Sequence, residues 1–244
     1  WSKYPHALLG SSEEEVGLAP GQAGNSEVGH MTIGAGRLLK QNEVLVNDFL
    51  LSPDMENKNV IKLIENKEKD IHIMGLCSDG NIHAGVDDFV NVYKFLVNND
   101  FKKIHFHLIT DGRDTGVHDA MKYINIIKDV IKQYGVGDIT SICGRFYAMD
   151  RDENWDRTKA YYDLVTLGKG LSSINIEKSI EGSYEKGITD EFIKPIICSK
   201  NTIKNGDIIM WMNYRADRAK QILSAFANWS SFEGFSVSNM KDTL

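Results

Sequence analysis

The sequence has little cysteine, little proline and no long apolar run. Its 244 residues include 3 cysteines and 4 prolines. Cys77, Cys143 and Cys198 stand far apart and form no CxxC pair, which excludes a disulfide scaffold and predicts buried, free thiols in a reducing compartment. No stretch approaches the ~18 apolar residues of a membrane span. The first residues do not resemble a signal peptide and include no initiator Met, so we expect a cytoplasmic protein, away from membranes, whose chain starts within a longer one.

A surplus of basic residues is also missing. Lys and Arg number 28 against 34 Asp and Glu, a net charge of -6, which argues against non-specific nucleic-acid binding over the whole surface. Neither a P-loop nor a GxGxxG motif occurs, which argues against a nucleotide-driven kinase. No histidines or cysteines have metal-ligand spacing, so the sequence alone defines no complete metal site.

The hydrophobic pattern changes at about residue 42. Residues 1–41 are rich in glycine and serine, and glycine at this density lets a backbone approach another group closely. Beyond residue 42, strand-like and helix-like segments alternate. The expected strands span 71–76, 104–109, 139–143 and 207–212, and the expected helices span 86–98, 118–134, 155–167 and 215–227. This order predicts an α/β fold with a mostly parallel sheet flanked by helices.

Charged side chains follow all four expected strands. They are His83; Arg113 and Asp114; Arg145 and Arg151; and Arg215, Asp217 and Arg218. Because the carboxyl ends of parallel strands meet at one edge of a sheet, five arginines should converge there. The planar guanidinium suits carboxylate and phosphate oxygens, so we predict a site for a small, multiply anionic ligand. For any single loop, the alternative remains that Arg and Asp simply pair with each other.

Ser26 lies in a glycine-rich turn and has two interpretations. Its hydroxyl could act as a nucleophile or cap the start of a helix, and taken alone the serine favours the cap. No GxSxG elbow surrounds it, and His30, four residues later, is a weak indication of a catalytic partner.

Seven specific motifs are spread over nearly the whole chain: Gly21–His30, Ile33–Arg37, Asp111–Thr115, Gly144–Asp152, Trp155–Arg157, Thr189–Phe192 and Asn213–Arg218. In sequence and in order they resemble the motifs of cofactor-independent (2,3-bisphosphoglycerate-independent) phosphoglycerate mutases. The resemblance implies an enzyme of the alkaline-phosphatase superfamily, in which a transferase domain is inserted into a metal-binding phosphatase domain. Residues 1–41 would then be part of the phosphatase domain, and residues 42–244 would be a C-terminally incomplete, substrate-binding transferase domain. The chain would be a fragment.

The resemblance also implies an activity. The full enzyme would be an isomerase that interconverts 2-phosphoglycerate and 3-phosphoglycerate, in glycolysis and gluconeogenesis, through a phosphoserine on Ser26. Ser26 would also be a metal ligand, with two manganese ions in the full-length enzyme and no 2,3-bisphosphoglycerate. Asp114 would act as general acid and base. The substrate-binding residues would be His83, Arg113, Asp114, Arg145, Arg151, Arg215 and Arg218.

Partners and alternatives complete these expectations. We expect a monomer that binds a small molecule and no nucleic acid, and a fragment that is inactive alone. Two other interpretations stay open. One is another phosphomutase or phosphatase of the alkaline-phosphatase superfamily, such as a phosphopentomutase. The other is a non-catalytic anion-binding domain, since only Ser26 of the metal ligands is present.

Overall fold

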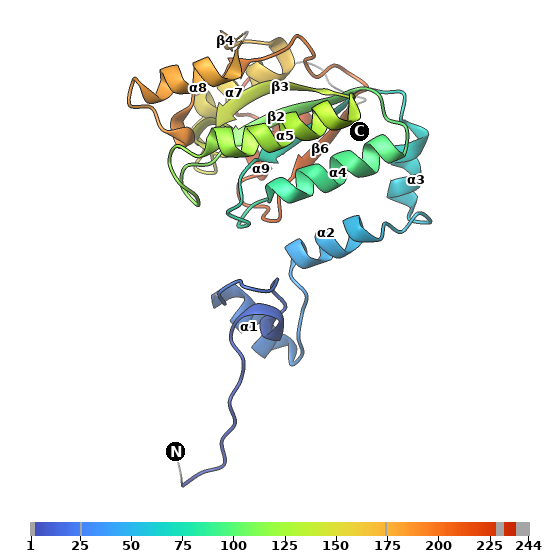
Figure 1. Ribbon diagram of the computed structural model, residues 1–244. Helices are drawn as coiled ribbons and strands as arrows, with labels where there is room; N and C mark the ends of the chain where they lie inside the picture. The colour runs from blue at the N-terminus through green and yellow to red at the C-terminus, as the bar shows by residue number, and fades with distance from the viewer. Residues whose placement is uncertain (1–2, 25, 174, 228–231, 238–244) are drawn as a thin grey trace. The chain divides into compact units, whose positions relative to one another are not determined.

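The computed structural model of the chain contains two compact units, Trp1–Asp54 and Met55–Leu244 (Figure 1). It describes residues 3–24, 26–173, 175–227 and 232–237. Asn25, within the glycine-rich run, lies outside the described residues.

The first unit is small and helical. The 3₁₀ helix η1 (Glu13–Val16) is followed by α1 (Ser26–Ala35) and α2 (Asn42–Leu51). A close backbone approach occurs at Gly17, which has a φ of 81° and where a Cβ would lie 1.9 Å from the carbonyl oxygen of Leu39. Only glycine avoids that clash and adopts this left-handed conformation readily. The buried apolar cluster of this unit consists of Val16, Leu18 and Val28.

The second unit is built on a six-stranded sheet with the order β4-β5-β3-β2-β1-β6. The strands are β1 (Ile71–Leu76), β2 (Ile104–Thr110), β3 (Asp138–Gly144), β4 (Leu171–Ser172), β5 (Ile196–Ile197) and β6 (Ile208–Met212). The neighbours β3, β2, β1 and β6 run parallel, while β5 pairs antiparallel with β3. Every residue of β1 and β2 is buried, as expected for a parallel sheet covered on both faces.

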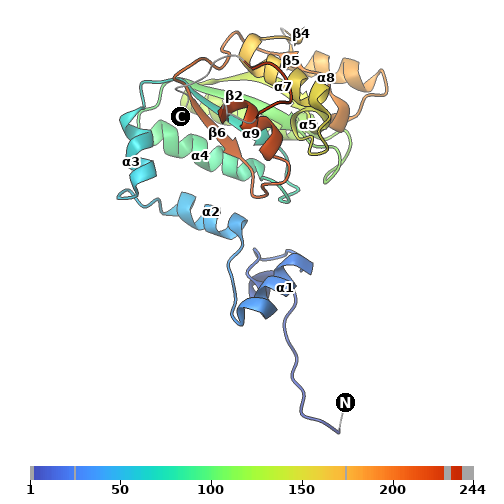
Figure 2. The same ribbon diagram turned by 180° about the vertical axis from the view of Figure 1, so that it is seen from behind.

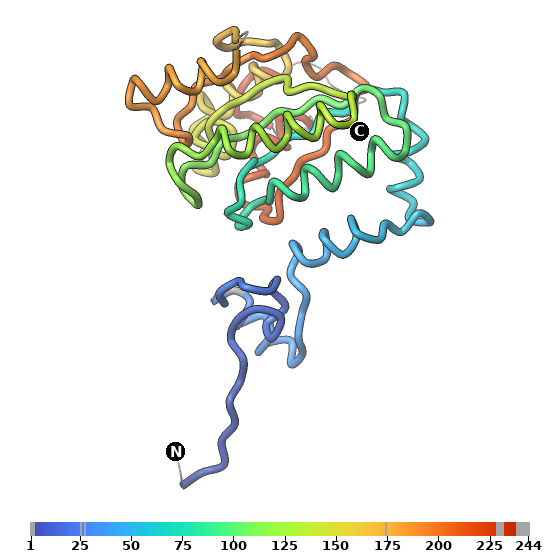
Figure 3. Tube along the Cα trace, viewed as in Figure 1, coloured from blue at the N-terminus to red at the C-terminus, as the bar shows by residue number. Residues whose placement is uncertain are grey.

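The second unit also contains helices, some of which cover the two faces of the sheet. The helices are α3 (Lys58–Glu65), α4 (Val86–Asn98), α5 (Ala120–Tyr134), α6 (Arg145–Ala148), α7 (Trp155–Leu167), α8 (Ile176–Tyr184), η2 (Asp190–Phe192) and α9 (Lys220–Ala227). Helices α4 and α5 lie on one face, and α7 and α9 lie on the other (Figures 1 and 2). The Cα trace in Figure 3 follows the alternation of strand and helix.

The predicted mostly parallel α/β architecture is confirmed, with one instructive error. The helix expected over 215–227 begins at Lys220. Before it, the side chain of Asn213 accepts the N–H of Arg215 at 3.2 Å and donates to the carbonyl of Arg215 at 2.7 Å. These local bonds hold the chain in turns and compete with helix formation. The helix expected from residue 118 likewise starts slightly later, at Ala120.

The thiols differ slightly from expectation. All three are free, with Cys77 and Cys143 buried but Cys198 only half-buried. In the part of the chain that the structure describes, no helix is both long and apolar enough to cross a membrane.

Two histidines form a chain of hydrogen bonds inside the sheet. His72 Nε2 lies 3.1 Å from Asp207 Oδ2, His72 Nδ1 lies 2.9 Å from His107 Nε2, and His107 Nδ1 lies 2.7 Å from Ser141 Oγ. An ionised carboxylate only accepts, so His72 donates from Nε2. With both rings neutral, His72 Nδ1 accepts from His107 Nε2 and His107 Nδ1 accepts from Ser141, so every bond can be made without a charged ring. Burial lowers the pKa of both rings, which agrees with this assignment.

Candidate anion-binding site

Four parallel strands end at the same edge of the sheet, and each is followed there by charged or polar residues. The residues are His83 between β1 and α4; Arg113 and Asp114 after β2; Arg145 at the start of α6, directly after β3; Arg151 between α6 and α7; and Arg215 and Arg218 between β6 and α9. All seven predicted substrate-binding residues therefore lie in loops or helix starts beyond the carboxyl ends of these strands.

A buried ion pair forms the centre of this edge. Arg145 is 3% exposed and donates from Nη1 to Asp111 at 2.7 Å and to Asp114 at 2.5 Å. Asp111 also accepts the hydroxyl of Ser78 and the N–H groups of Arg113 and Asp114. Burial opposes ionisation of Asp111, but these hydrogen bonds outweigh it and lower its pKa. The pair thus fixes the carboxylate of Asp114 at the edge of the sheet.

His83 is buried at the same edge, and one of its ring nitrogens makes no hydrogen bond to the described residues. Its side chain is 5% exposed, and its Nδ1 has no hydrogen-bond partner in the described residues. The carbonyl of His83 accepts the N–H of Tyr214 at 2.6 Å, which ties this loop to the one after β6. Burial lowers the pKa of His83 to about 4, and nearby cations contribute; these are Arg145, Arg215 and Arg218. The ring is therefore neutral near pH 7 and retains an unused hydrogen-bonding position.

Contacts also join the loops after β3 and β6, although β2 and β1 lie between these strands. Arg151 donates to Asp217 at 2.7 Å, and Arg215 Nε lies 3.7 Å from the same carboxylate. Arg218 donates to the carbonyl of Met149 at 2.9 Å. Asp217 thus holds two guanidinium groups near each other.

The guanidinium groups are close enough to repel one another. Burial lowers the pKa of Arg218, and the charges of Arg145, Arg151 and Arg113 lower it further. Arg113 lies 3.6 Å from Glu191, with its side chain 57% exposed. In the described residues no carboxylate forms an ion pair with Arg218. A multiply charged anion would relieve this repulsion, as a ligand site requires.

Ser26 lies in the first unit, at the start of α1, and is exposed. Its Oγ is 3.1 Å from Nδ1 of His30, but that nitrogen is also 2.6 Å from the carbonyl oxygen of Ser26. Because a carbonyl only accepts, Nδ1 carries a proton in this arrangement. His30 thus contacts Ser26 as the four-residue spacing allows, yet it is not placed to take the proton of the hydroxyl.

The residues at hand do not form a metal centre by themselves. Across the described ranges, no group of three or more His, Cys, Asp or Glu side chains is arranged to hold a metal ion. One hydroxyl cannot by itself bind two manganese ions, so the described residues do not make up the metal site that the resemblance implies for the full-length enzyme.

Two polar residues at this edge were missed as site residues in the sequence. Asp111 and Asp217 were visible beside the arginines, but their pairing with Arg145 and Arg151 depends on contacts between separate loops. The sequence of a loop shows which charged residues it carries, but not which residues of other loops they pair with.

Comparison with known proteins shows which proteins this chain resembles. Residues 44–244 match the family model for the BPG-independent PGAM N-terminus (iPGM_N). The chain is 40% identical over 240 residues to the 2,3-bisphosphoglycerate-independent phosphoglycerate mutase of Parasynechococcus marenigrum, covering 96% of this chain and 44% of that protein. The mutase of Clostridium novyi is 39% identical, with 96% and 48% covered.

A solved structure shows the same fold. Leishmania mexicana phosphoglycerate mutase, solved at low cobalt concentration, superimposes with a TM-score of 0.85 at 26% identity, covering 96% of this chain and 46% of that one. The chain thus spans a little under half the length of the relatives it matches. The resemblance read from the motifs is confirmed: the chain belongs to the family of 2,3-bisphosphoglycerate-independent phosphoglycerate mutases and corresponds to its N-terminal part.

Proposed function

We propose that this chain supplies the substrate-binding edge of an isomerase that interconverts 3-phosphoglycerate and 2-phosphoglycerate without 2,3-bisphosphoglycerate. The observation that carries the proposal is the buried, neutral His83, with an unfilled Nδ1, beside Arg145, Arg215 and Arg218. Both phosphoglycerates carry a carboxylate and a phosphate, and guanidinium groups bind either group through paired hydrogen bonds. A neutral imidazole adds a hydrogen bond without adding to the repulsion among the cations.

The proposed roles follow from the contacts of each side chain. Arg113, Arg151, Arg215 and Arg218 bind the carboxylate and phosphate oxygens of the substrate, because they are at least partly exposed at the sheet edge. Arg145 differs, since its buried Nη1 is already committed to Asp111 and Asp114. It therefore orients Asp114, which as general acid and base moves a proton to or from the glycerate hydroxyls.

Ser26 is the proposed nucleophile. The phosphoryl group would pass from the substrate to the Ser26 hydroxyl and return to the other glycerate oxygen, which splits one difficult transfer into two easier ones. His30 is not available as the base in the tautomer that its hydrogen bond to the Ser26 carbonyl requires, so another group must accept the proton. In this proposal residues 1–41 belong to a phosphatase domain, residues 42–244 belong to a transferase domain, and the protein is a cytoplasmic monomer.

The test uses a protein of the relatives' length that contains this chain (the full-length protein). Ser26→Ala should reduce mutase turnover by several powers of ten, because removal of a nucleophile has an effect of this size. Ser11→Ala, which alters another exposed serine of the same unit, is the control and should retain activity. A Ser26→Ala protein that keeps more than about a hundredth of the wild-type rate would refute covalent catalysis at this residue.

A further inference from the structure

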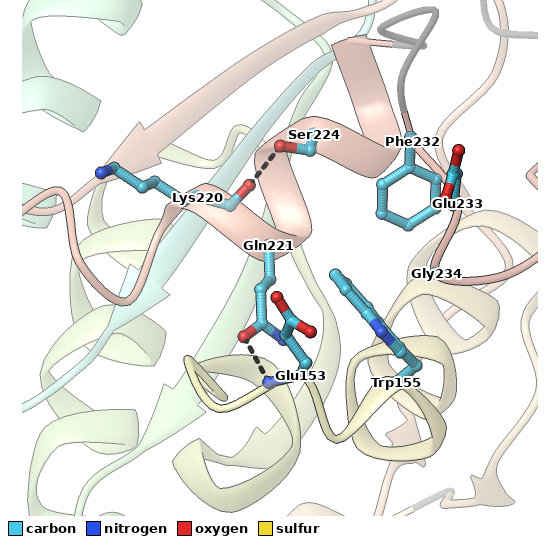
Figure 4. Close-up of a pocket in the computed structure, with 8 residues that line it drawn as sticks. All are labelled: Glu153, Trp155, Lys220, Gln221, Ser224, Phe232, Glu233 and Gly234. Carbon is cyan, nitrogen blue, oxygen red and sulfur yellow. Dashed lines mark hydrogen bonds between the residues drawn. The ribbon is translucent and has the colours of Figure 1, made fainter.

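The loop that carries Arg151 is held by a glutamine of α9. Gln221 is 8% exposed, and its Oε1 accepts the N–H of Glu153 at 3.0 Å (Figure 4). Its Nε2 donates to Asp150 Oδ2 and to Thr158 Oγ1, each at 3.1 Å. The amide of one α9 side chain is thus bonded to the 150–154 loop at two points and to α7 at one.

Asp150 organises the interior of this loop. Its carboxylate accepts the N–H groups of Asp152 and Asn154 at 3.1 and 2.9 Å and the side-chain amide of Asn154 at 2.9 Å. Burial opposes ionisation of Asp150, but these bonds and the one from Gln221 outweigh it and lower its pKa. The loop backbone therefore wraps around an ionised carboxylate that Gln221 joins to α9.

The loop conformation needs such an external hold. Glu153 has a φ of 60°, in the left-handed region that non-glycine residues disfavour. A pocket of about 470 Å³ lies beside it, lined in part by Trp155, Gln221 and Phe232, as Figure 4 shows. On that side of the loop Glu153 borders the pocket, and its N–H is held by the hydrogen bond to Gln221.

Arg151 depends on this loop for its position. It follows Asp150 directly, its side chain is 46% exposed, and its ion-pair partner is Asp217. Gln221 follows Arg218 by three residues, and Arg218 also contacts the segment after β3, through the carbonyl of Met149. The segment from Asp217 to Gln221 therefore holds both the side chain of Arg151 and the backbone that carries it.

We propose that Gln221 is a positioning residue for Arg151, whose amide fixes the 150–154 loop so that the guanidinium meets the anionic substrate. This inference rests on the proposed function, since it gives Arg151 a phosphoglycerate to bind. A purely structural role, in which Gln221 only joins α9 to α7, would act through Thr158. The two roles use different hydrogen bonds of the same amide and can be separated.

Gln221→Glu is the discriminating variant. The new side chain has the same shape and can still accept the N–H of Glu153, but it places a carboxylate against that of Asp150. Repulsion should release the loop at alkaline pH, and protonation of the new carboxyl should restore the donor to Asp150 as the pH falls. A wild-type glutamine has no such titration.

The experiment measures KM and kcat for 3-phosphoglycerate in the full-length protein between about pH 8 and pH 6. We expect Gln221→Glu to raise KM about tenfold at the alkaline end, the loss of roughly one good hydrogen bond to the substrate, with kcat within about twofold of wild type. KM should return toward the wild-type value at the acidic end. Thr158→Val should leave KM unchanged, and so should Ser224→Ala, which removes an α9 hydroxyl that donates to the carbonyl of Lys220.

The outcomes separate the two proposals. If Arg151→Ala leaves KM unchanged, the substrate-binding role of Arg151 fails and the inference fails with it. If Arg151→Ala raises KM but Gln221→Glu does not, or if Thr158→Val raises it as much, the positioning role alone is overturned. Gln221→Leu covers the case in which the glutamate variant does not fold: it should raise KM with no recovery at low pH, and an unchanged KM would refute the inference.

Discussion

Two polar clusters occupy the same parallel sheet and behave in opposite ways. In the chain of His72 and His107, every ring nitrogen has a partner, from Asp207 at one end to Ser141 at the other. At the carboxyl edge, His83 is also buried, but its Nδ1 has no hydrogen-bond partner in the part of the chain that the structure describes. All three histidines have a lowered pKa, caused first by burial. Burial and a shifted pKa therefore do not by themselves distinguish a ligand site from a structural network. A buried polar atom that lacks a hydrogen-bond partner does.

The largest effect on stability is expected for Arg145. This residue lies at the carboxyl edge of the sheet, but its guanidinium group forms a buried ion pair with Asp111. Arg145→Met should lower the free energy of unfolding by about 3–5 kcal/mol, because it leaves the Asp111 carboxylate buried without its cation. The matched variant Arg218→Met loses a bond to a carbonyl and should lower it by only about 1 kcal/mol. Urea unfolding of the full-length proteins measures both.

This comparison of variants has a clear contrary result. Equal losses for Arg145→Met and Arg218→Met would mean that the two arginines are held alike. The distinction between Arg145, held in a buried ion pair, and Arg218, which donates to a carbonyl, would then be wrong.

Substitution of Arg215, whose side chain is exposed, should affect substrate binding rather than the stability of the fold. Arg215→Ala should weaken 3-phosphoglycerate binding by ~1.5–3 kcal/mol, the scale of a charge-assisted hydrogen bond, and Arg215→Lys should recover only part because the planar fork is lost. Its side chain is 48% exposed, so the urea midpoint should not move. Calorimetric titration of full-length Ser26→Ala protein, which cannot turn over substrate, gives the affinities. An unchanged affinity in Arg215→Ala would remove this residue from the site.

The difference between the clusters also explains what the sequence could and could not predict. The strands β1, β2, β3 and β6 and the helices α4 and α7 were predicted almost to the residue, because continuous apolar runs and amphipathic periods determine them, whereas the two-residue strands β4 and β5 were not predicted. The charged edge was predicted because the topology of parallel strands gathers the loops that follow them. The start of α9 at Lys220 was missed, because the bonds of Asn213 to Arg215 break a helical pattern that composition alone supports.

Gln221 was missed for a related reason. It is uncharged, sits within a helical pattern and acts through residues about 70 positions away. Such a role follows from tertiary contacts and leaves no local signal. The neutral tautomers of His72 and His107 are likewise a product of strand register, since the two residues come together only when β1 and β2 pair.

The closed histidine chain should affect stability rather than binding. His107→Leu removes the donor to His72 and the acceptor for Ser141, and it should lower the free energy of unfolding by about 1–3 kcal/mol because buried polar groups are left unpaired. KM for 3-phosphoglycerate should stay at the wild-type value. Hydrogen exchange of the β2 amides reports the loss locally. His118→Leu, which alters an exposed histidine whose ring lies beside that of Tyr184, is the control and should not change that exchange.

The smallest expected effect is a pH dependence of stability. The folded protein keeps His72 and His107 neutral below their ordinary pKa of 6.5, while the unfolded chain takes up protons there. Where the unfolded state binds more protons than the folded state, the free energy of unfolding decreases as the pH is lowered. It should therefore decrease as the pH drops through about 6.5, by at most ~1.4 kcal/mol per pH unit for each group.

His105 works against this trend and allows it to be tested. Burial alone would lower its pKa, but bonds to Asp138 at 2.6 Å and Asp70 at 3.3 Å raise it. The folded state therefore binds more protons at His105, which adds stability below pH 6.5 and loses it as the pH rises through the raised value. Urea midpoints at about pH 7.5, 6.5 and 5.5 should fall on acidification in wild type, more steeply in His105→Gln and less steeply in His107→Leu. A steeper fall in His107→Leu than in wild type would show that this ring is charged in the folded sheet, and the closed, neutral chain would have to be redrawn.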